Sequence, residues 1–216
     1  MQYTPNKEVI AKRIAGFFKT GDVVNLGIGL PTLVANYVPE EVTIILQSEN
    51  GFVGTGPVPP EGQEDPDLTN AGATPVTLLP GGAYFDSAVS FGIIRGRHLD
   101  YTVLGVLEVD QEGNLANYKI PGKLVPGMGG AMDLTVGAKH VITATTHFEK
   151  SCKSKLKEAC TLPLTAVNAV DYVVTDLGFF AVRDGAFMLE EYFSPYTPEF
   201  IIEQTDATVI EAPDCR

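Results

Sequence analysis

The sequence predicts an α/β protein with a mainly parallel sheet that is flanked by helices and extended by antiparallel hairpins. Helix-like and strand-like segments alternate along most of the chain, and this order builds parallel sheets through crossover connections. Residues 42–46 are all apolar or β-branched, which is typical of a parallel strand buried on both faces. Asp184-Gly185 stands between two apolar runs and favours a tight hairpin turn.

Each element of the first half follows from a local signal. Thr4-Pro5 predicts the start of a helix whose apolar residues continue at helical spacing as far as Phe18. Residues 22–26 predict a strand, and a second helix is expected over residues 31–37, where proline stands first. Residues 51–66 are crowded with glycine and proline, so we expect a long ordered loop there.

The second half is assigned in the same way. Asp86 or Ser87 is expected to cap a helix, Thr197-Pro198 to start the final helix, and residues 131–136 to form another. A turn over residues 110–114 predicts that the strands on either side form a hairpin. Strands are expected over residues 77–79, 101–109, 115–120, 140–145, 172–175, 179–182, 186–189 and 208–210.

Length, composition and charge restrict the possible functions. The 216 residues, 44% of them hydrophobic, can bury one α/β core or two small ones, and we expect residues 1–216 to form one domain. The net charge of −12 argues against a nucleic-acid-binding surface. No segment resembles the ~20 apolar residues of a membrane span, and no signal peptide is apparent. We therefore expect a cytoplasmic protein.

Several catalytic classes are disfavoured as well. The three cysteines cannot pair fully, and none stands in a CxxC motif or at zinc-like spacing from a histidine, so we expect no metal. Neither a GxSxG motif nor a P-loop occurs, which argues against hydrolases and NTPases. Thr32 stands where a dinucleotide fingerprint needs its third glycine, so a nicotinamide cofactor is disfavoured.

The stretch Ser48-Glu49-Asn50-Gly51 is the best placed for chemistry. It follows the apolar run over residues 42–46, and ligands of open α/β sheets bind beyond the carboxyl ends of the strands. Asn50 and Gly51 tolerate a positive φ and let backbone and substrate approach closely. Glu49 is therefore a candidate nucleophile toward an activated acyl group, if oxyanion donors lie near it. The alternative is a glutamate that only caps the next element.

Two glycine-rich segments and one basic cluster are candidates for binding anions. Gly27 and Gly29 lie in a turn between strand and helix, which either cradles an anion or has only a steric role. Residues 121–130 carry further glycines whose amides can donate to a negatively charged oxygen, among them Gly127, Gly129 and Gly130. The basic cluster either binds phosphate or is simply solvated, and consists of Lys150, Lys153, Lys155 and Lys157.

The order of the motifs is more informative than any one of them. In sequence these are Gly27-Ile28-Gly29-Leu30-Pro31-Thr32, Ser48-Glu49-Asn50-Gly51, Tyr84-Phe85-Asp86-Ser87, Ile94-Arg95-Gly96, Glu108-Val109-Asp110, Gly113-Asn114-Leu115-Ala116-Asn117, Pro121-Gly122-Lys123, Gly127-Met128-Gly129-Gly130-Ala131-Met132-Asp133 and Thr161-Leu162-Pro163-Leu164-Thr165. Together they closely resemble the B (β) subunit of family I CoA-transferases, over about residues 7–184. The Ser-Glu-Asn-Gly tetrapeptide is a signature of that family.

The resemblance implies an enzyme with the CoA-transferase-like fold that moves CoA from an acyl-CoA to a free carboxylic acid. Glu49 would carry the CoA as a glutamyl-CoA thioester, and no metal or redox cofactor would be needed. Gly129 and Gly130 would lie near the thioester, with Gly27, Gly29, Asn50, Gly51 and Gly127 around the site. Asn117 would lie near the CoA arm; the alternative is a strand-end amide that is satisfied within the fold.

The resemblance also implies a partner, an A (α) subunit of similar fold, in an α2β2 assembly with the active site where the two meet. Val89 favours short-chain acids such as acetate, butyrate and acetoacetate, used in fermentation or a 3-oxoacid pathway. Succinyl-CoA:3-oxoacid specificity is the alternative. Two other functions remain open: a sugar-phosphate isomerase or ligand sensor of the same fold group, and a non-catalytic scaffold protein within a larger complex.

Overall fold

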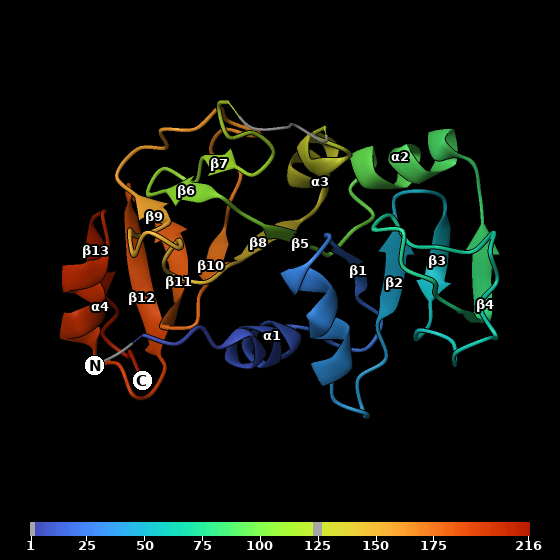
Figure 1. Cartoon of the computed structure of the whole chain (residues 1–216), viewed down its shortest axis with the longest axis horizontal. Coiled ribbons are helices and arrows are strands. Elements are labelled where there is room, and N and C mark those ends of the chain that lie inside the picture. Colours follow the sequence, from blue (N-terminus) through green and yellow to red (C-terminus); the bar gives the residue numbers. More distant parts are fainter. Residues whose placement is uncertain (1–2, 123–126) are drawn as a thin grey trace.

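The computed structural model describes residues 3–122 and 127–216, which build a ten-stranded sheet with helices on both faces (Figure 1). Part of the segment 121–130 and Lys123 therefore lie outside the described residues. The strand order is β13-β12-β11-β10-β8-β5-β1-β2-β3-β4. Its centre is parallel and consists of β1 (Val23–Leu26), β2 (Ile45–Ser48), β5 (Tyr101–Gly105), β8 (His140–Ala144) and β10 (Tyr172–Val174).

Antiparallel strands extend this parallel centre at both ends, as the sequence predicts. At one end lie β3 (Phe52–Thr55) and β4 (Leu78–Tyr84). At the other end β11 (Gly178–Arg183) pairs with β12 (Ala186–Tyr192), and β13 (Val209–Glu211) adds a parallel edge. The expected turn joins β11 to β12, with a positive φ at both of its central residues, Asp184 and Gly185.

The helices form layers on the two faces of the sheet. On one face lie α1 (Lys7–Ala15) and the 3₁₀ helix η1 (Leu30–Tyr37). On the other lie α2 (Ser87–Arg95), α3 (Ala131–Gly137) and a small sheet of β7 (Leu115–Ala116), β6 (Glu108–Asp110) and β9 (Leu156–Lys157). The last helix is α4 (Pro198–Gln204). None of the described helices is long and apolar enough to cross a bilayer.

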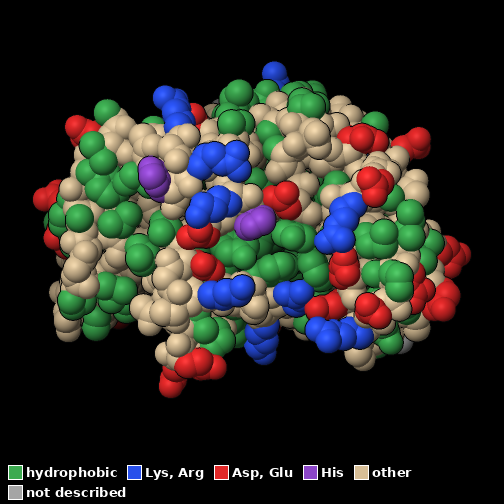
Figure 2. All heavy atoms as spheres, turned by 180° about the vertical axis from the view of Figure 1, so that it is seen from behind, with side chains coloured by type: hydrophobic (Ala, Val, Ile, Leu, Met, Phe, Trp, Pro, Cys, Tyr) green, Lys and Arg blue, Asp and Glu red, His purple; other side chains and the backbone are tan. Residues whose placement is uncertain are grey.

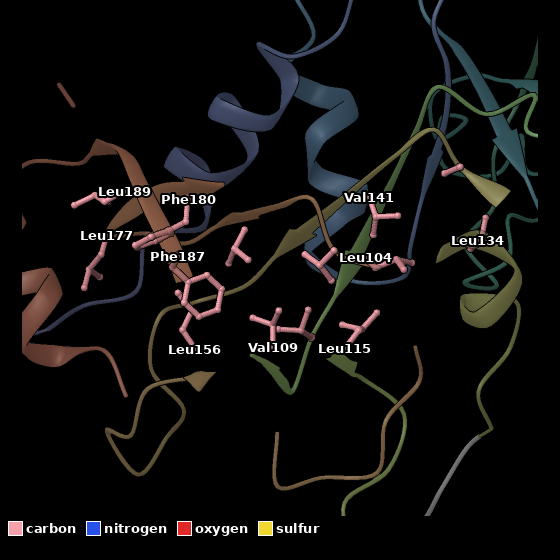
Figure 3. Close-up of a cluster of buried hydrophobic side chains, with 14 of the residues drawn as sticks. Leu104, Val109, Leu115, Leu134, Val141, Leu156, Leu177, Phe180, Phe187 and Leu189 are labelled. Carbon is pink, nitrogen blue, oxygen red and sulfur yellow. The ribbon is translucent and has the colours of Figure 1, made fainter. Parts of the chain in front are cut away.

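Two hydrophobic clusters fill the layers because neighbouring strand residues point to opposite faces. On β5, Val103 packs under α1 and η1, whereas Leu104 belongs to the cluster on the other face. Figure 3 shows this second cluster, in which Leu134 of α3 and Val109 of the small sheet lie around Leu104 and Val141. The parallel centre is therefore largely buried on both faces, except at the start of β2, where Ile45 is exposed.

The surface opposite the view of Figure 1 carries both signs of charge. Lys and Arg side chains are interspersed with Asp and Glu side chains and with apolar areas on this face (Figure 2). This face therefore lacks the continuous basic patch that is typical of nucleic-acid-binding proteins.

The structure corrects the strand expected over residues 101–109. The chain leaves the large sheet after Gly105, and residues 108–110 join the small sheet as β6. The returning strand is also shorter than the expected 115–120, because only Leu115 and Ala116 pair as β7. Periodicity could not reveal this break, since Val106 on its far side is as apolar as Leu104.

Other boundaries differ for local reasons. Helix α1 is capped by Asn6, whose side chain accepts from two main-chain amides, rather than by Thr4. The second helix is 3₁₀. The strand expected over residues 42–46 begins only at Ile45. Thr43 and Ile45 are exposed and the other three residues are only partly buried, so the expected burial on both faces is wrong for this run. The loop expected over residues 51–66 begins with β3, which pairs with β2.

Helices α2 and α3 offer two glycines that predict opposite effects on stability. A Cβ at exposed Gly92 of α2 meets no neighbour, so Gly92→Ala should raise the free energy of unfolding by about 0.5 to 1 kcal/mol. A Cβ at buried Gly137 of α3 collides with the carbonyl oxygen of Ile94, so Gly137→Ala should lower it by about 1 to 3 kcal/mol. Urea unfolding measures both, and a stabilising Gly137→Ala would contradict the packing of α3 on α2.

Candidate active site

A cavity of about 500 Å³ lies at the carboxyl ends of the central strands. Its wall includes the segment after β5, where the chain leaves the large sheet, and the end of β1. The glycine segment 127–130 and the loop residues 70–72 complete much of the rest. This is the edge of an open α/β sheet where ligands bind, and the departure of the chain after Gly105 makes room for the cavity.

Glu49 lies on this wall, directly after the last residue of β2. It is half-buried, and burial is the largest effect that raises the pKa of its carboxyl group. The negative charge of Asp133 raises this pKa further, while a hydrogen bond from the main chain of Gly130 opposes the shift. The ionised carboxylate is therefore less stabilised here than in water, which favours its attack on a carbonyl group.

Gly129 and Gly130 stand directly against the carboxylate of Glu49. A Cβ at Gly130 would collide with Oε2 of Glu49, and one at Gly129 would lie 3.6 Å from Oε1. Gly129 also has a φ of +58°, a conformation that favours glycine. Main-chain groups approach the carboxylate closely because these two residues have no side chain.

Asp133 and Arg95 form an ion pair beside the site. Arg95 Nε lies 2.6 Å from Asp133 Oδ1, which joins the end of α2 to the first turn of α3. Asp133 belongs to one of the sequence motifs, but no role was predicted for it. An aspartate in the first turn of a helix has an ordinary local explanation, so only its proximity to Glu49 reveals its effect on the carboxylate.

Buried hydrogen bonds hold the main chain at Glu49. The Ser90 hydroxyl donates to the carbonyl oxygen of Glu49 at 2.7 Å and accepts from Gln47 Nε2 at 3.0 Å. Asn25 Nδ2 in turn donates to Gln47 Oε1 at 2.8 Å. All three polar side chains are buried. None of them was predicted as a site residue from the sequence.

The structure brings most of the predicted site residues to one cavity. Its wall includes Gly27, Glu49, Asn117, Gly127, Gly129 and Gly130. Asn117 Oδ1 also accepts a hydrogen bond from the Thr165 hydroxyl at 2.7 Å, so the satisfied-amide alternative holds for that atom while the residue still lines the cavity.

Three predicted residues are absent from the cavity wall and lie in turns next to residues that line it. Gly29 has a φ of +88° and precedes η1, with its carbonyl oxygen accepting from Thr32. Asn50 Nδ2 donates to the carbonyl oxygen of Thr69 at 2.7 Å. Gly51 has a φ of +129°, and a Cβ there would collide with the carbonyl oxygen of Phe85.

Three lysines of the cluster, Lys150, Lys155 and Lys157, line a different cavity, next to Phe148 and Tyr3. Lys155 is partly buried, and its Nζ donates to the hydroxyl groups of Thr145 and Thr146 at 2.9 and 3.0 Å. Burial lowers the pKa of Lys155. Lys157 pairs with Asp206 at 2.8 Å. Lys155 and Lys157 are therefore bound to neighbouring side chains of the fold, whereas Lys150 and Lys153 are exposed.

Comparison with known proteins gives a consistent family. The family model described as coenzyme A transferase matches residues 7–204. The beta subunit of the acetate CoA-transferase of Escherichia coli K12 is 56% identical over 185 residues, or 86% of this chain and 84% of that protein. The B subunit of the probable succinyl-CoA:3-ketoacid coenzyme A transferase of Bacillus subtilis is 50% identical over 198 residues, or 92% of this chain and 92% of that protein.

A mitochondrial relative is much longer. The rat succinyl-CoA:3-ketoacid coenzyme A transferase 2A is 46% identical over 179 residues, which are 82% of this chain but only 34% of that protein.

Solved structures share the fold at low sequence identity. An acyl-CoA transferase from Escherichia coli O157:H7, in a thioester complex with CoA, matches with a TM-score of 0.76 and 21% identity, over 100% of this chain and 44% of its own. The glutaconate coenzyme A-transferase of Acidaminococcus fermentans matches with a TM-score of 0.68 and 21% identity, over 99% and 88%. The decarboxylase AibA/AibB matches with a TM-score of 0.70 and 17% identity, over 99% and 88%.

The fold alone does not decide the family. The family is shown by the family model, which matches residues 7–204, and by the 50–56% identity to CoA-transferase subunits over most of the chain. This chain is a CoA-transferase and belongs to the coenzyme A transferase family.

Proposed function

We propose that this chain is the β-type subunit of an enzyme that transfers CoA from a short-chain acyl-CoA to a free carboxylic acid, with Glu49 as the covalent carrier. The observation that carries the proposal is the position of Glu49. Its carboxylate lies in the cavity, partly desolvated, against the main chain of Gly129 and Gly130. Such an arrangement suits a carboxylate nucleophile that needs main-chain donors near the reacting atoms.

The first half of the reaction loads the enzyme. An oxygen of ionised Glu49 attacks the thioester carbonyl of the acyl-CoA, and cleavage of the C–S bond leaves an acyl-glutamyl anhydride and CoA thiolate. The thiolate then attacks the glutamyl carbonyl carbon of the anhydride. The first acid leaves as a carboxylate, and a glutamyl-CoA thioester remains on Glu49.

The second half reverses these steps with another acid. Its carboxylate attacks the glutamyl-CoA carbonyl, CoA thiolate leaves, and the thiolate then attacks the acyl carbonyl of the new anhydride. This attack releases the new acyl-CoA and restores ionised Glu49. Each step exchanges one activated acyl bond for another, so the reaction needs no metal or redox cofactor. The site must instead exclude water and hold its reactants at high effective concentration.

The main chain of Gly130 is the group best placed to stabilise the developing oxyanion. It already donates toward the Glu49 carboxylate, and the glutamyl carbonyl of each intermediate is built from that same carboxyl group. Asn117 and Gly127 line the same cavity and are suited to contact the CoA arm. Remote contacts with CoA can contribute binding energy to the strained steps at the thioester.

We further propose an α-type partner subunit, in an α2β2 assembly. The bacterial relatives at 56% and 50% identity are named as beta and B subunits. This chain spans only 34% of the rat enzyme and 44% of the acyl-CoA transferase chain of known structure, which leaves room in those longer chains for a second unit. The partner would complete the site around Glu49.

For the acids we propose acetate, butyrate or acetoacetate, in keeping with the acetate CoA-transferase name of the relative at 56% identity. The second candidate is succinyl-CoA:3-ketoacid specificity, which the name of the Bacillus subtilis relative at 50% identity favours. Val89 adds little to this choice, because it is 49% exposed on α2 and is absent from the cavity wall.

Covalent loading of Glu49 is the central expectation. In complex with the α-type partner, incubation with acetyl-CoA or butyryl-CoA should add one CoA-sized mass to this chain at Glu49, before and not after borohydride reduction. The acid that discharges the adduct fastest identifies the acceptor, with acetate and succinate compared directly. Glu49→Gln should lose the adduct and at least about 10⁴-fold of the transfer rate. If Glu49→Gln transfers CoA as fast as the wild type, Glu49 is not the carrier, and the alternative of a non-catalytic scaffold protein is favoured.

Gly130→Ala tests the contact between main chain and carboxylate. Gly130 has φ −83° and ψ 6°, the angles of the third residue of a type I turn, which most residues can adopt, so the fold should persist. The new Cβ displaces the Glu49 carboxylate, and displacement by about 1 Å should slow adduct formation about 100-fold or more. Gly92→Ala is the matched control, because its Cβ meets open space. Equal rates in the two variants would contradict the proposed geometry.

Asp133→Asn tests the electrostatics of Glu49. Only the ionised carboxylate attacks, so the rate of adduct formation should fall as the pH drops through the pKa of Glu49. Removing the charge of Asp133 lowers this pKa, so the acid limb of the pH–rate profile should move to lower pH. Asp184→Asn removes an equal charge at the distant hairpin turn and should leave the limb in place. A shift toward higher pH in Asp133→Asn would refute the assignment.

A further inference from the structure

We propose that Ser90 is a positioning residue for Glu49, whose buried hydroxyl holds the main chain of the nucleophile in place throughout the reaction. This inference rests on the proposed function of Glu49. Ser90 lies on α2, is absent from the cavity wall, and bonds the main chain of Glu49 and not its carboxylate. Its action on the reaction is therefore indirect, through the carbonyl group of Glu49.

The hydrogen bonds run in one direction toward Glu49. A serine hydroxyl carries a single proton, and that of Ser90 goes to the carbonyl oxygen of Glu49 at 2.7 Å. The oxygen of Ser90 then accepts from Gln47 Nε2 at 3.0 Å. Gln47 Oε1 accepts from Asn25 Nδ2 at 2.8 Å. The series begins on β1, crosses β2 and α2, and ends on the nucleophile.

Burial makes this arrangement costly unless every member is bonded. Ser90 is fully buried, and Asn25 and Gln47 are only 4% and 3% exposed. Ser90 lies one turn before Ile94, which is also fully buried and packs into the apolar core. A small apolar side chain would fit the space at Ser90, but it would take the hydroxyl away from both the carbonyl oxygen of Glu49 and Gln47 Nε2.

A second contact from the same region fixes the other side of the turn. The amide of Phe85, just before α2, donates to the carbonyl oxygen of Gly51 at 2.9 Å. The amide of Gly51 donates to the carbonyl oxygen of Ser48 at 3.1 Å. Residues 85–90 therefore hold the turn over residues 48–51 at two points, with Phe85 bonded to the carbonyl oxygen of Gly51 and Ser90 to that of Glu49.

The hydrogen bonds from Gly130 and from Ser90 to Glu49 respond differently to the reaction. Ionised Glu49 is held partly by the hydrogen bond from the main chain of Gly130. In the anhydride and the glutamyl-CoA thioester that charge is gone, and this bond weakens. The bond from Ser90 goes to the main chain and is unaffected by the chemistry. It keeps the glutamyl carbonyl opposite Gly130 while thiolate and acid exchange.

The test compares Ser90→Ala and Ser90→Cys in the complex with the α-type partner. Single-turnover mass measurements with acetyl-CoA should show the maximal rate of adduct formation lowered about tenfold or more in Ser90→Ala, with a smaller loss in Ser90→Cys, which keeps a weak donor. The acetyl-CoA concentration that gives half of this rate should stay close to the wild-type value. A larger share of the adduct should be lost to water instead of to acetate.

Thr205→Val is the matched control. The Thr205 hydroxyl is also buried, also donates to a carbonyl oxygen, that of Ile201 at 2.6 Å, and also faces a buried side-chain nitrogen, His147 Nε2 at 3.1 Å. It lies directly after α4, outside the cavity wall. Thr205→Val should lower stability as Ser90→Ala does, yet leave the rate of adduct formation and the share lost to water unchanged.

Two results would overturn the inference, and they differ from failure of the proposed function. If the adduct forms as fast in Ser90→Ala as in the wild type, Ser90 has no positioning role. Equal slowing in Thr205→Val and Ser90→Ala would show a general effect of lost stability. If the wild-type complex forms no adduct at all, the proposed function fails and the role of Ser90 fails with it.

Discussion

The approach of the Glu49 carboxylate to the main chain of Gly130 is the constraint on which the rest of the site depends. Any side chain at Gly130 would occupy the place of the carboxylate. The end of β2 and the start of α3 must therefore be held at a fixed distance, and α2 connects them. Ile94 of α2 packs against Gly137 of α3, while Ser90 of α2 binds the main chain at Glu49. One helix thus contacts both the main chain at Glu49 and the helix that follows Gly130.

The cavity itself results from the way one strand ends. Val103 and Leu104 pack into the two apolar clusters on opposite faces of the sheet. After Gly105 the chain leaves the large sheet and enters the small sheet. The residues of this crossing, 105–107, line the cavity, and Val106 also belongs to the apolar cluster on that face. A strand that continued to residue 109 would fill this space. The apolar cluster on that face and the cavity wall therefore share this segment.

Local chemistry explains what the sequence predicted well. The alternation of elements, the tight turn at Asp184 and the position of Glu49 at a strand end depend on neighbours in the sequence, and the structure has all three. The break after Gly105 and the roles of Ser90 and Asp133 depend on contacts between distant segments. A serine on an apolar helix face and an aspartate in a first turn have ordinary local explanations, so no pattern singled them out. The strand-end position made Glu49 a candidate nucleophile, and the family resemblance added the expected glutamyl-CoA thioester.

A decarboxylase at 17% identity shares the fold, so the fold alone does not decide the reaction. In this chain the charge of the Glu49 carboxylate is poorly stabilised, by burial first and by Asp133 second. Under the proposed mechanism Glu49 loses this charge whenever it carries an acyl group or CoA. The resting enzyme is then the electrostatically unfavourable state and the covalent intermediates relieve it, which lowers the energy needed to form an anhydride from a weak nucleophile. When this charge is lost, the hydrogen bond from Gly130 to Glu49 weakens. We propose that the buried bond from Ser90 to the main chain then keeps Glu49 in place, because that bond takes no part in the chemistry.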